Sequence, residues 1–169
     1  MNIFFLSRDP DECAAYHADK HVVKMILESA QMLCTALNET SGLPTLTIYK
    51  STHANHPCTK WVSASRHNAL WLYDLMIALG EEYTYRYGKQ HKTIEKMRDD
   101  AILIKIRVVL PDVPATPYAQ AMPDEYKHND AVTAYRTYYL NDKRALLKYT
   151  KREVPHWVGD KEIGDKETA

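Results

Sequence analysis

The sequence predicts a mainly α-helical, compact single domain of about four helices, with long irregular loops and at most a short N-terminal strand. Apolar residues recur at helical spacing in long segments that are separated by proline and glycine. The 169 residues are enough to bury one sizeable core, and 45% apolar with 26% charged residues is a globular composition. We therefore expect one globular domain over residues 1–158 and a polar C-terminal tail at 159–169.

The N-terminal part has a clear helix start. Residues 3–6 suit a short strand, and the next apolar segment opens behind Asp9 as N-cap, Pro10 at the first helical position and Glu12 at the third. This start predicts a first helix that reaches to about Asn38. We expect the helix to bend near Asp19, which lies on its apolar side and needs a partner if it is buried.

Helix-breaking glycines and prolines separate the remaining elements. Residues 39–58 read as a loop with one short strand, and a helical region from 59 to 87 ends before Gly88. Further helices are predicted over 93–108 and 129–149. The segment between them is kept irregular by Pro111, Pro114, Pro117 and Pro123.

Composition excludes several classes of protein. No apolar run approaches the roughly 18 residues of a membrane span, and the start MNIFFLSRD lacks the features of a signal peptide, so we expect a cytoplasmic protein, in the host cytoplasm if it is phage-encoded. Basic and acidic residues number 22 each, so no global field attracts nucleic acid. A basic patch is nevertheless predicted near the C-terminal end. Three cysteines without CxxC spacing read as small core residues.

One polar stripe in the first helix predicts a site. Its members fall within about 80° of arc on an α-helix. They are His17, His21, Lys24, Glu28, Gln31 and Thr35. The opposite side is apolar and docks the helix on the core. The alternative interpretation is a solvated face. Against it, Lys24 precedes Glu28, and this order is less favourable than Glu before Lys for an ion pair on a helix surface.

A second cluster, His53, Asn55 and His56, precedes Pro57 at the start of a helix. Imidazoles and free backbone amides at a helix start suit an anion such as phosphate. A structural turn in which Asn55 caps the helix is the alternative. A metal site is a third reading, because His17 and His21 have the i,i+4 spacing of a zinc-binding pair and this cluster would complete the shell.

Aromatic and basic residues alternate in three later segments, residues 81–92, 134–139 and 148–157. Such a mixture is suited to stacking on bases and binding phosphates. Half-buried packing is the alternative for most of these tyrosines. The candidate DNA-contacting residues here are Arg86, Arg136, Lys148, Arg152 and Trp157. Glu82 lies on the side of its helix that faces the core, where it could face Glu28. A carboxylate that points inward requires a partner or a function, because burying a charge is costly.

The segments DKHVVKMILESAQML, NHPCTKW and ALGEEYTYRYG together resemble the helical layout of pyrimidine-dimer DNA glycosylases and related uncharacterised phage proteins, over roughly residues 17–88. The resemblance implies an α-rich domain that excises a damaged base with an amine nucleophile and one glutamate. In that family the nucleophile is the α-amine of a small residue exposed by loss of the initiator methionine. Asn2 does not favour that loss, which leaves Met1 itself or a side-chain amine such as Lys24.

Our leading hypothesis is a DNA base-excision glycosylase for damaged or modified pyrimidines, with lyase activity left open. Its catalytic candidates are Glu28, Lys24, His21 and Glu82. Its substrate-binding candidates are His17, Gln31, His53, Asn55, His56, Arg86, Arg136, Lys148, Arg152 and Trp157. We expect DNA or a nucleotide as partner, and no cofactor or metal. The alternatives are a metal-dependent nucleotide phosphohydrolase, using the histidines with Asp19, and a non-catalytic nucleic-acid or protein-binding module.

Overall fold

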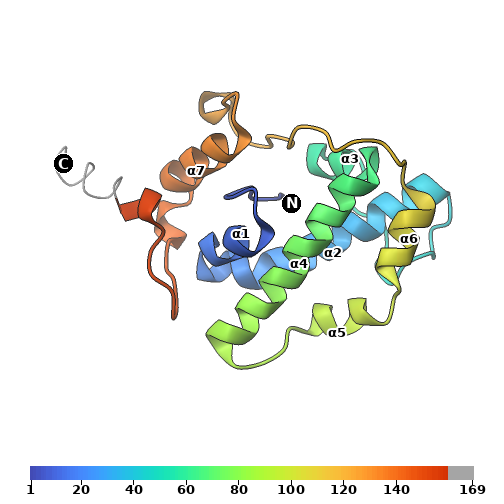
Figure 1. The fold of residues 1–169 in the computed structure, drawn as a ribbon, viewed down its shortest axis with the longest axis horizontal. Helices are drawn as coiled ribbons and strands as arrows, with labels where there is room; N and C mark the ends of the chain where they lie inside the picture. The colour runs from blue at the N-terminus through green and yellow to red at the C-terminus, as the bar shows by residue number, and fades with distance from the viewer. Residues whose placement is uncertain (160–169) are drawn as a thin grey trace.

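The computed structural model describes residues 1–159, and within them the fold is mainly helical without any strand (Figure 1). The α-helices are α1 (Pro10–Tyr16), α2 (Asp19–Ser41), α3 (Pro57–Ala64), α4 (Arg66–Tyr87), α5 (Lys92–Arg98), α6 (Ile102–Val109) and α7 (Ala131–Asp142). Two short 3-10 helices, η1 (Asp124–Tyr126) and η2 (Arg144–Leu146), flank α7. The mainly helical class is confirmed, whereas the expected number of about four helices is wrong.

The predicted first helix is two helices, because the chain is extended at His17 and Ala18. The backbone N–H of Ala18 bonds outside these two helices and donates to the Tyr139 hydroxyl at 3.0 Å. The next N–H, that of Asp19, donates to the Lys148 carbonyl at 2.8 Å. These long-range hydrogen bonds replace the helical ones, so the predicted bend is a complete break.

The second and third predicted helices are also interrupted. Ser65 has an extended backbone between α3 and α4. Its hydroxyl accepts from the His67 N–H and donates to the Val113 carbonyl at 2.6 Å. Ala101 adopts a left-handed conformation, with φ of 52°, between α5 and α6. The predicted last helix ends at Asp142, and Lys143 leads into η2.

Residues 3–6 form no strand, and neither does the loop at 39–58, so both strand predictions are wrong. Residues 3–6 are fully buried among helices, and a strand requires a neighbouring strand for its backbone bonds. Phe4 lies 5.3 Å from Tyr139 of α7, and Phe5 lies 5.0 Å from Trp71 of α4, as ring centroids. Figure 1 shows this N-terminal segment in the middle of the fold, between α7 and α4.

The long helices α2 and α4 pack against each other and form the centre of the core. The predicted apolar stripe of α2 is buried, as are the cysteines, which are all free. The predicted helix boundaries at Asp9 and Gly88 are confirmed: the Asp9 carboxylate accepts from the Glu12 N–H at 3.0 Å, and Gly88 has φ of 73°. Within residues 1–159 no helix combines the length and apolarity needed to cross a bilayer. Apart from Gly159, the predicted tail lies outside the described residues.

Candidate active site

An ion pair joins the chain terminus to the polar stripe of α2. The α-amine of Met1 lies 3.0 Å from Oε1 of Glu28, and the side chains of the two residues are only 4% and 10% exposed. The Lys24 amine lies farther away, 3.9 Å from Oε2, on a side chain that is 68% exposed. Glu28 Oε2 is buried without a hydrogen-bond partner. A nearly buried carboxylate therefore faces two amines, of which the α-amine is nearer.

These groups line a small pocket of about 140 Å³, which we call the amine pocket. Its walls come from the N-terminal segment, α2, α7 and the residue after α7. They are Met1, Asn2, Phe4, His21, Lys24, Met25, Glu28, Tyr138 and Lys143. Three amines and one carboxylate share this pocket, so the excess of positive charge favours an anionic group such as a phosphate at its mouth.

The shared face of His21, Lys24 and Glu28 was predicted from their spacing, and all three line the amine pocket. The alternative of a solvated face is wrong, because His21 is 5% exposed, Glu28 is 8% exposed and Thr35 is fully buried. The N-terminal segment covers the part of the stripe that contains His21 and Glu28. Farther along α2, the Thr35 hydroxyl forms two hydrogen bonds with the backbone of Thr52, at 3.0 and 3.2 Å. Gln31 is half-buried.

His21 is held as a neutral ring. It stacks on Phe4 at 4.4 Å, and its Nδ1 lies 2.6 Å from the Tyr139 hydroxyl. That hydroxyl also accepts from the Ala18 N–H at 3.0 Å, and the direction of its bond to His21 Nδ1 depends on the tautomer of the ring. Burial, with smaller effects from His17 and two lysines, lowers the pKa of His21 to about 3. His21 is therefore neutral and is not a positive charge beside the amines of the pocket.

Glu82 does not face Glu28, contrary to the sequence-based expectation. It belongs to a separate buried network around Arg86, which is 2% exposed. Arg86 contacts Asp19 and Glu82 at 2.9 Å each, and Arg152 contacts both Glu82 oxygens at 2.8 and 2.9 Å. Burial raises the pKa of Glu82, but the hydrogen bonds from Arg152 and Arg86 outweigh it and hold that pKa below its ordinary value. This network supplies the partner that Asp19 was expected to need.

Other predicted DNA contacts are occupied inside the protein. His17 is fully buried with Nδ1 at 2.6 Å from the Cys13 carbonyl, and burial lowers its pKa to about 4. Arg136 donates to the Leu6 carbonyl at 3.0 Å and lies 5.3 Å from the centre of the half-buried Trp157 ring. Arg152 lies 4.2 Å from the centre of the Tyr85 ring. Lys148, by contrast, is exposed.

The histidine loop lies beside the chain terminus. His56, not Asn55, caps α3, because its Nδ1 accepts from the Cys58 N–H at 3.0 Å. Burial lowers the pKa of His56, and the positive charge of the Met1 α-amine lowers it further. His53 is exposed and has φ of 52°, a conformation uncommon for a residue with a side chain. Asn55 is exposed.

The residues proposed for a metal do not converge. His17 bonds to a carbonyl and His21 to a hydroxyl, while both oxygens of Asp19 accept from Thr150 and Arg86. In the described part of the chain, no group of three or more metal-binding side chains is placed to hold an ion.

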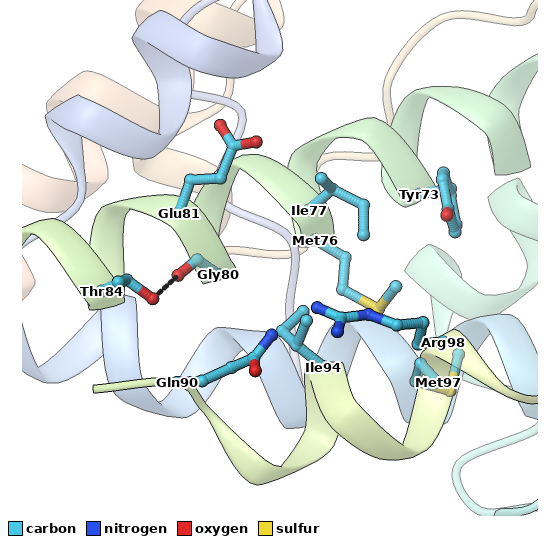
Figure 2. Close-up of a pocket in the computed structure, with 10 residues that line it drawn as sticks. All are labelled: Tyr73, Met76, Ile77, Gly80, Glu81, Thr84, Gln90, Ile94, Met97 and Arg98. Atoms are coloured by element: carbon cyan, nitrogen blue, oxygen red, sulfur yellow. Dashed lines mark hydrogen bonds between the residues drawn. The ribbon is translucent and has the colours of Figure 1, made fainter.

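A larger cavity with a mainly apolar lining lies elsewhere, between α4 and α5 (Figure 2). It measures about 410 Å³ and is lined chiefly by apolar side chains such as Met76, Ile77 and Ile94. In Figure 2 the Glu81 carboxylate points away from Ile94, on the far side of the α4 ribbon. Because this cavity brings no amine and carboxylate together, we assign the chemistry to the smaller amine pocket.

Sequence reasoning did not select Phe4 or Tyr138 for the site and placed Lys143 only in the basic patch near the C-terminal end, but all three line the amine pocket. Lys143 belongs to the predicted basic patch, and its amine lies 5.3 Å from the centre of the Tyr138 ring. The only sequence signal for these residues was that basic and aromatic residues cluster around α7.

A family model described as pyrimidine dimer DNA glycosylase matches residues 1–96, more than half of the 169-residue chain. The matched region includes Met1, Lys24 and Glu28. A search of curated proteins found no match, and neither did a search of solved structures.

Proposed function

The chain belongs to the pyrimidine dimer DNA glycosylase family, and we propose that it excises damaged pyrimidines from DNA with the Met1 α-amine as nucleophile and Glu28 as its carboxylate partner. The observation that carries this proposal is the 3.0 Å contact between these two groups inside a pocket that opens to solvent. An amine and a carboxylate in hydrogen-bond contact form a nucleophile with a proton acceptor already in place.

The α-amine attacks C1′ of the damaged nucleotide in its unprotonated form, after a proton has passed to Glu28. The bond from C1′ to the base breaks, and the base leaves with the electron pair. Loss of a second N–H proton and opening of the C1′–O4′ bond, with a proton delivered to O4′, give a protonated imine between the amine and C1′. The imine also permits loss of a C2′ proton and elimination of the 3′ phosphate, which would be the lyase step.

Glu28 accepts the amine proton and passes it to the departing base, and the carboxylate that results is the negative charge beside the sugar carbon that becomes positive. Its side chain is 10% exposed, so water screens this interaction only weakly. Preorganised charge of this kind is a large contribution to rate enhancement in enzymes. Lys24 is the weaker candidate for nucleophile, because its flexible side chain is 68% exposed and lies farther from the carboxylate.

His21 and two lysines supply the remaining interactions. Tyr139 engages Nδ1 of the neutral His21 ring, and in the tautomer that carries its proton on Nε2 the ring donates this N–H to a sugar or phosphate oxygen in the amine pocket. Lys24 and Lys143 at the pocket, with the exposed Lys148 farther along the chain, hold backbone phosphates. Arg86, Arg136 and Arg152 stabilise the fold through their internal contacts.

Borohydride trapping tests this function. The protein is incubated with duplex DNA containing one pyrimidine dimer or one abasic site, and borohydride reduces any imine to a stable covalent adduct. We expect an adduct on both DNAs, and none on undamaged DNA. A matched variant carrying two extra residues before Met1 keeps every side chain but displaces the α-amine, so it should form no adduct.

Two results would contradict the proposal. An extended variant that traps as well as the natural chain would exclude the α-amine. Absence of an adduct and of base release on every damaged duplex would favour the non-catalytic binding module instead.

A further inference from the structure

Asn2 connects the chain terminus to distant parts of the fold. Its Nδ2 donates to the Ala121 carbonyl at 3.0 Å, and its Oδ1 accepts from the Ile3 N–H at 2.8 Å. The Cys58 thiol of α3 lies 3.4 Å from the same oxygen. Both ends of one amide are therefore used, and the partners come from the segment before α7 and from α3.

The backbone segment to which Asn2 bonds is held in place by Tyr135, which is fully buried. The Tyr135 hydroxyl donates to the Ala119 carbonyl at 2.6 Å and accepts from the Ala121 N–H at 3.1 Å. The same hydroxyl is 3.3 Å from Asn2 Oδ1. Because one buried hydroxyl orders the backbone on which Asn2 rests, the position of Asn2 is determined by the core.

The side chain of Met1 is buried in its turn, at 4% exposure, and packs against the core. If Met1 were removed, the new α-amine would belong to Asn2, roughly one 3.8 Å residue step away from the present one. The contact with Glu28 would then be lost, and a cavity would remain where the methionine had packed. The 3.0 Å contact with Glu28 belongs to a chain that keeps Met1, and asparagine at position 2 does not favour its removal.

We propose that Asn2 is a positioning residue: its amide holds the α-amine of a retained Met1 against Glu28. This inference rests on the proposed function for its catalytic consequence, but the positioning itself can be measured without any DNA. Asn2 does not touch the reacting atoms; it acts through Met1.

The first test is chemical labelling of the free protein. A limiting amount of an amine-acylating reagent is added to the natural chain and to Asn2→Leu, which keeps a bulky second residue but has no amide. Mass spectrometry of the intact chain checks that Met1 is present, and peptide mapping gives the labelling rate of the α-amine relative to Lys60, an exposed lysine outside the amine pocket. We expect Asn2→Leu to increase this ratio several-fold.

The second test compares binding with chemistry. A displacement of about 1 Å can lower a rate on the order of 100-fold, so Asn2→Leu should trap abasic DNA at least tenfold more slowly while its DNA affinity stays within twofold. Asn2→Gln, which retains both polar groups on a longer side chain, should recover part of the rate. Asn38→Leu is the matched control: this buried asparagine also bonds with both ends of its amide, to Tyr49 and Thr47, and its loss should leave the trapping rate of folded protein unchanged.

The outcomes separate the two proposals. Unchanged α-amine labelling in Asn2→Leu, or loss of Met1 from the natural chain, overturns the positioning role whether or not the protein is active. Increased labelling in a protein whose natural form never traps DNA supports the positioning role and contradicts the proposed function. If Asn2→Leu does not fold, wild-type labelling and trapping in Asn2→Asp, which lacks the Nδ2 donor, would overturn the proposal.

Discussion

Glu28→Gln tests the role of the carboxylate with the smallest change in shape. In the natural chain the Met1 α-amine lies 3.0 Å from Glu28 Oε1. The glutamine amide oxygen can still accept a hydrogen bond from this amine, but the side chain can neither take a proton nor carry negative charge. Removing one preorganised charge partner from an active site costs about 2.7–4 kcal/mol of barrier, which corresponds to a 10²–10³-fold loss of rate. We expect a loss of this size in the single-turnover rate of borohydride trapping.

The stability of Glu28→Gln should change much less than its activity. One hydrogen bond survives and one charge-assisted contact is weakened, so a loss of about 1 kcal/mol is expected, or roughly 2–4 °C in Tm for a chain of this size. Glu81→Gln is the control, since Glu81 is an exposed glutamate of α4 outside the amine pocket. Wild-type trapping by Glu28→Gln would refute the reasoning, as would a rate loss fully explained by unfolding.

Three further predictions concern charge and pH. Lys24→Ala should still trap DNA at Met1, while the slope of log affinity against log salt becomes shallower by about one unit; loss of trapping would make Lys24 the nucleophile. The pKa values of His17 and His21 are lowered to about 4 and about 3, so the unfolded chain binds more protons below pH 6.5, and stability should fall as pH falls from about 6.5 to 4. Urea unfolding should show a shallower pH dependence in His21→Phe, and an unchanged one would contradict the buried neutral ring. Arg86→Met leaves two buried carboxylates without this partner and should cost about 3–5 kcal/mol, measured by urea unfolding, whereas a DNA-contacting Arg86 would lower affinity and leave stability intact.

The parts of the fold that could be predicted are those with local causes. The Asp9 cap and the left-handed Gly88 follow from side-chain chemistry and backbone sterics within a few residues. The break at Ala18 depends on the Tyr139 hydroxyl, 121 residues away in sequence, and the break at Ser65 depends on the Val113 carbonyl. Neither contact leaves a trace in the local pattern, so continuous helices were predicted.

The candidate site divides in the same way. Lys24 and Glu28 could be placed together because both lie on one helix, and helical spacing determines their common face. Tyr138 and Lys143 reach the amine pocket only through tertiary packing. Glu82 was correctly expected to be buried, but its partners are Arg86 and Arg152, so the reason for its burial is an ion-pair network.

The most direct test of the central claim is to identify the nitrogen that forms the covalent bond. The borohydride-reduced adduct with abasic DNA is digested with nuclease and protease, and mass spectrometry locates the remaining sugar fragment on one peptide. The α-amine of an intact Met1 is the predicted site, because it lies 3.0 Å from the Glu28 carboxylate. A sugar fragment on Lys24 or on any other lysine would contradict the account.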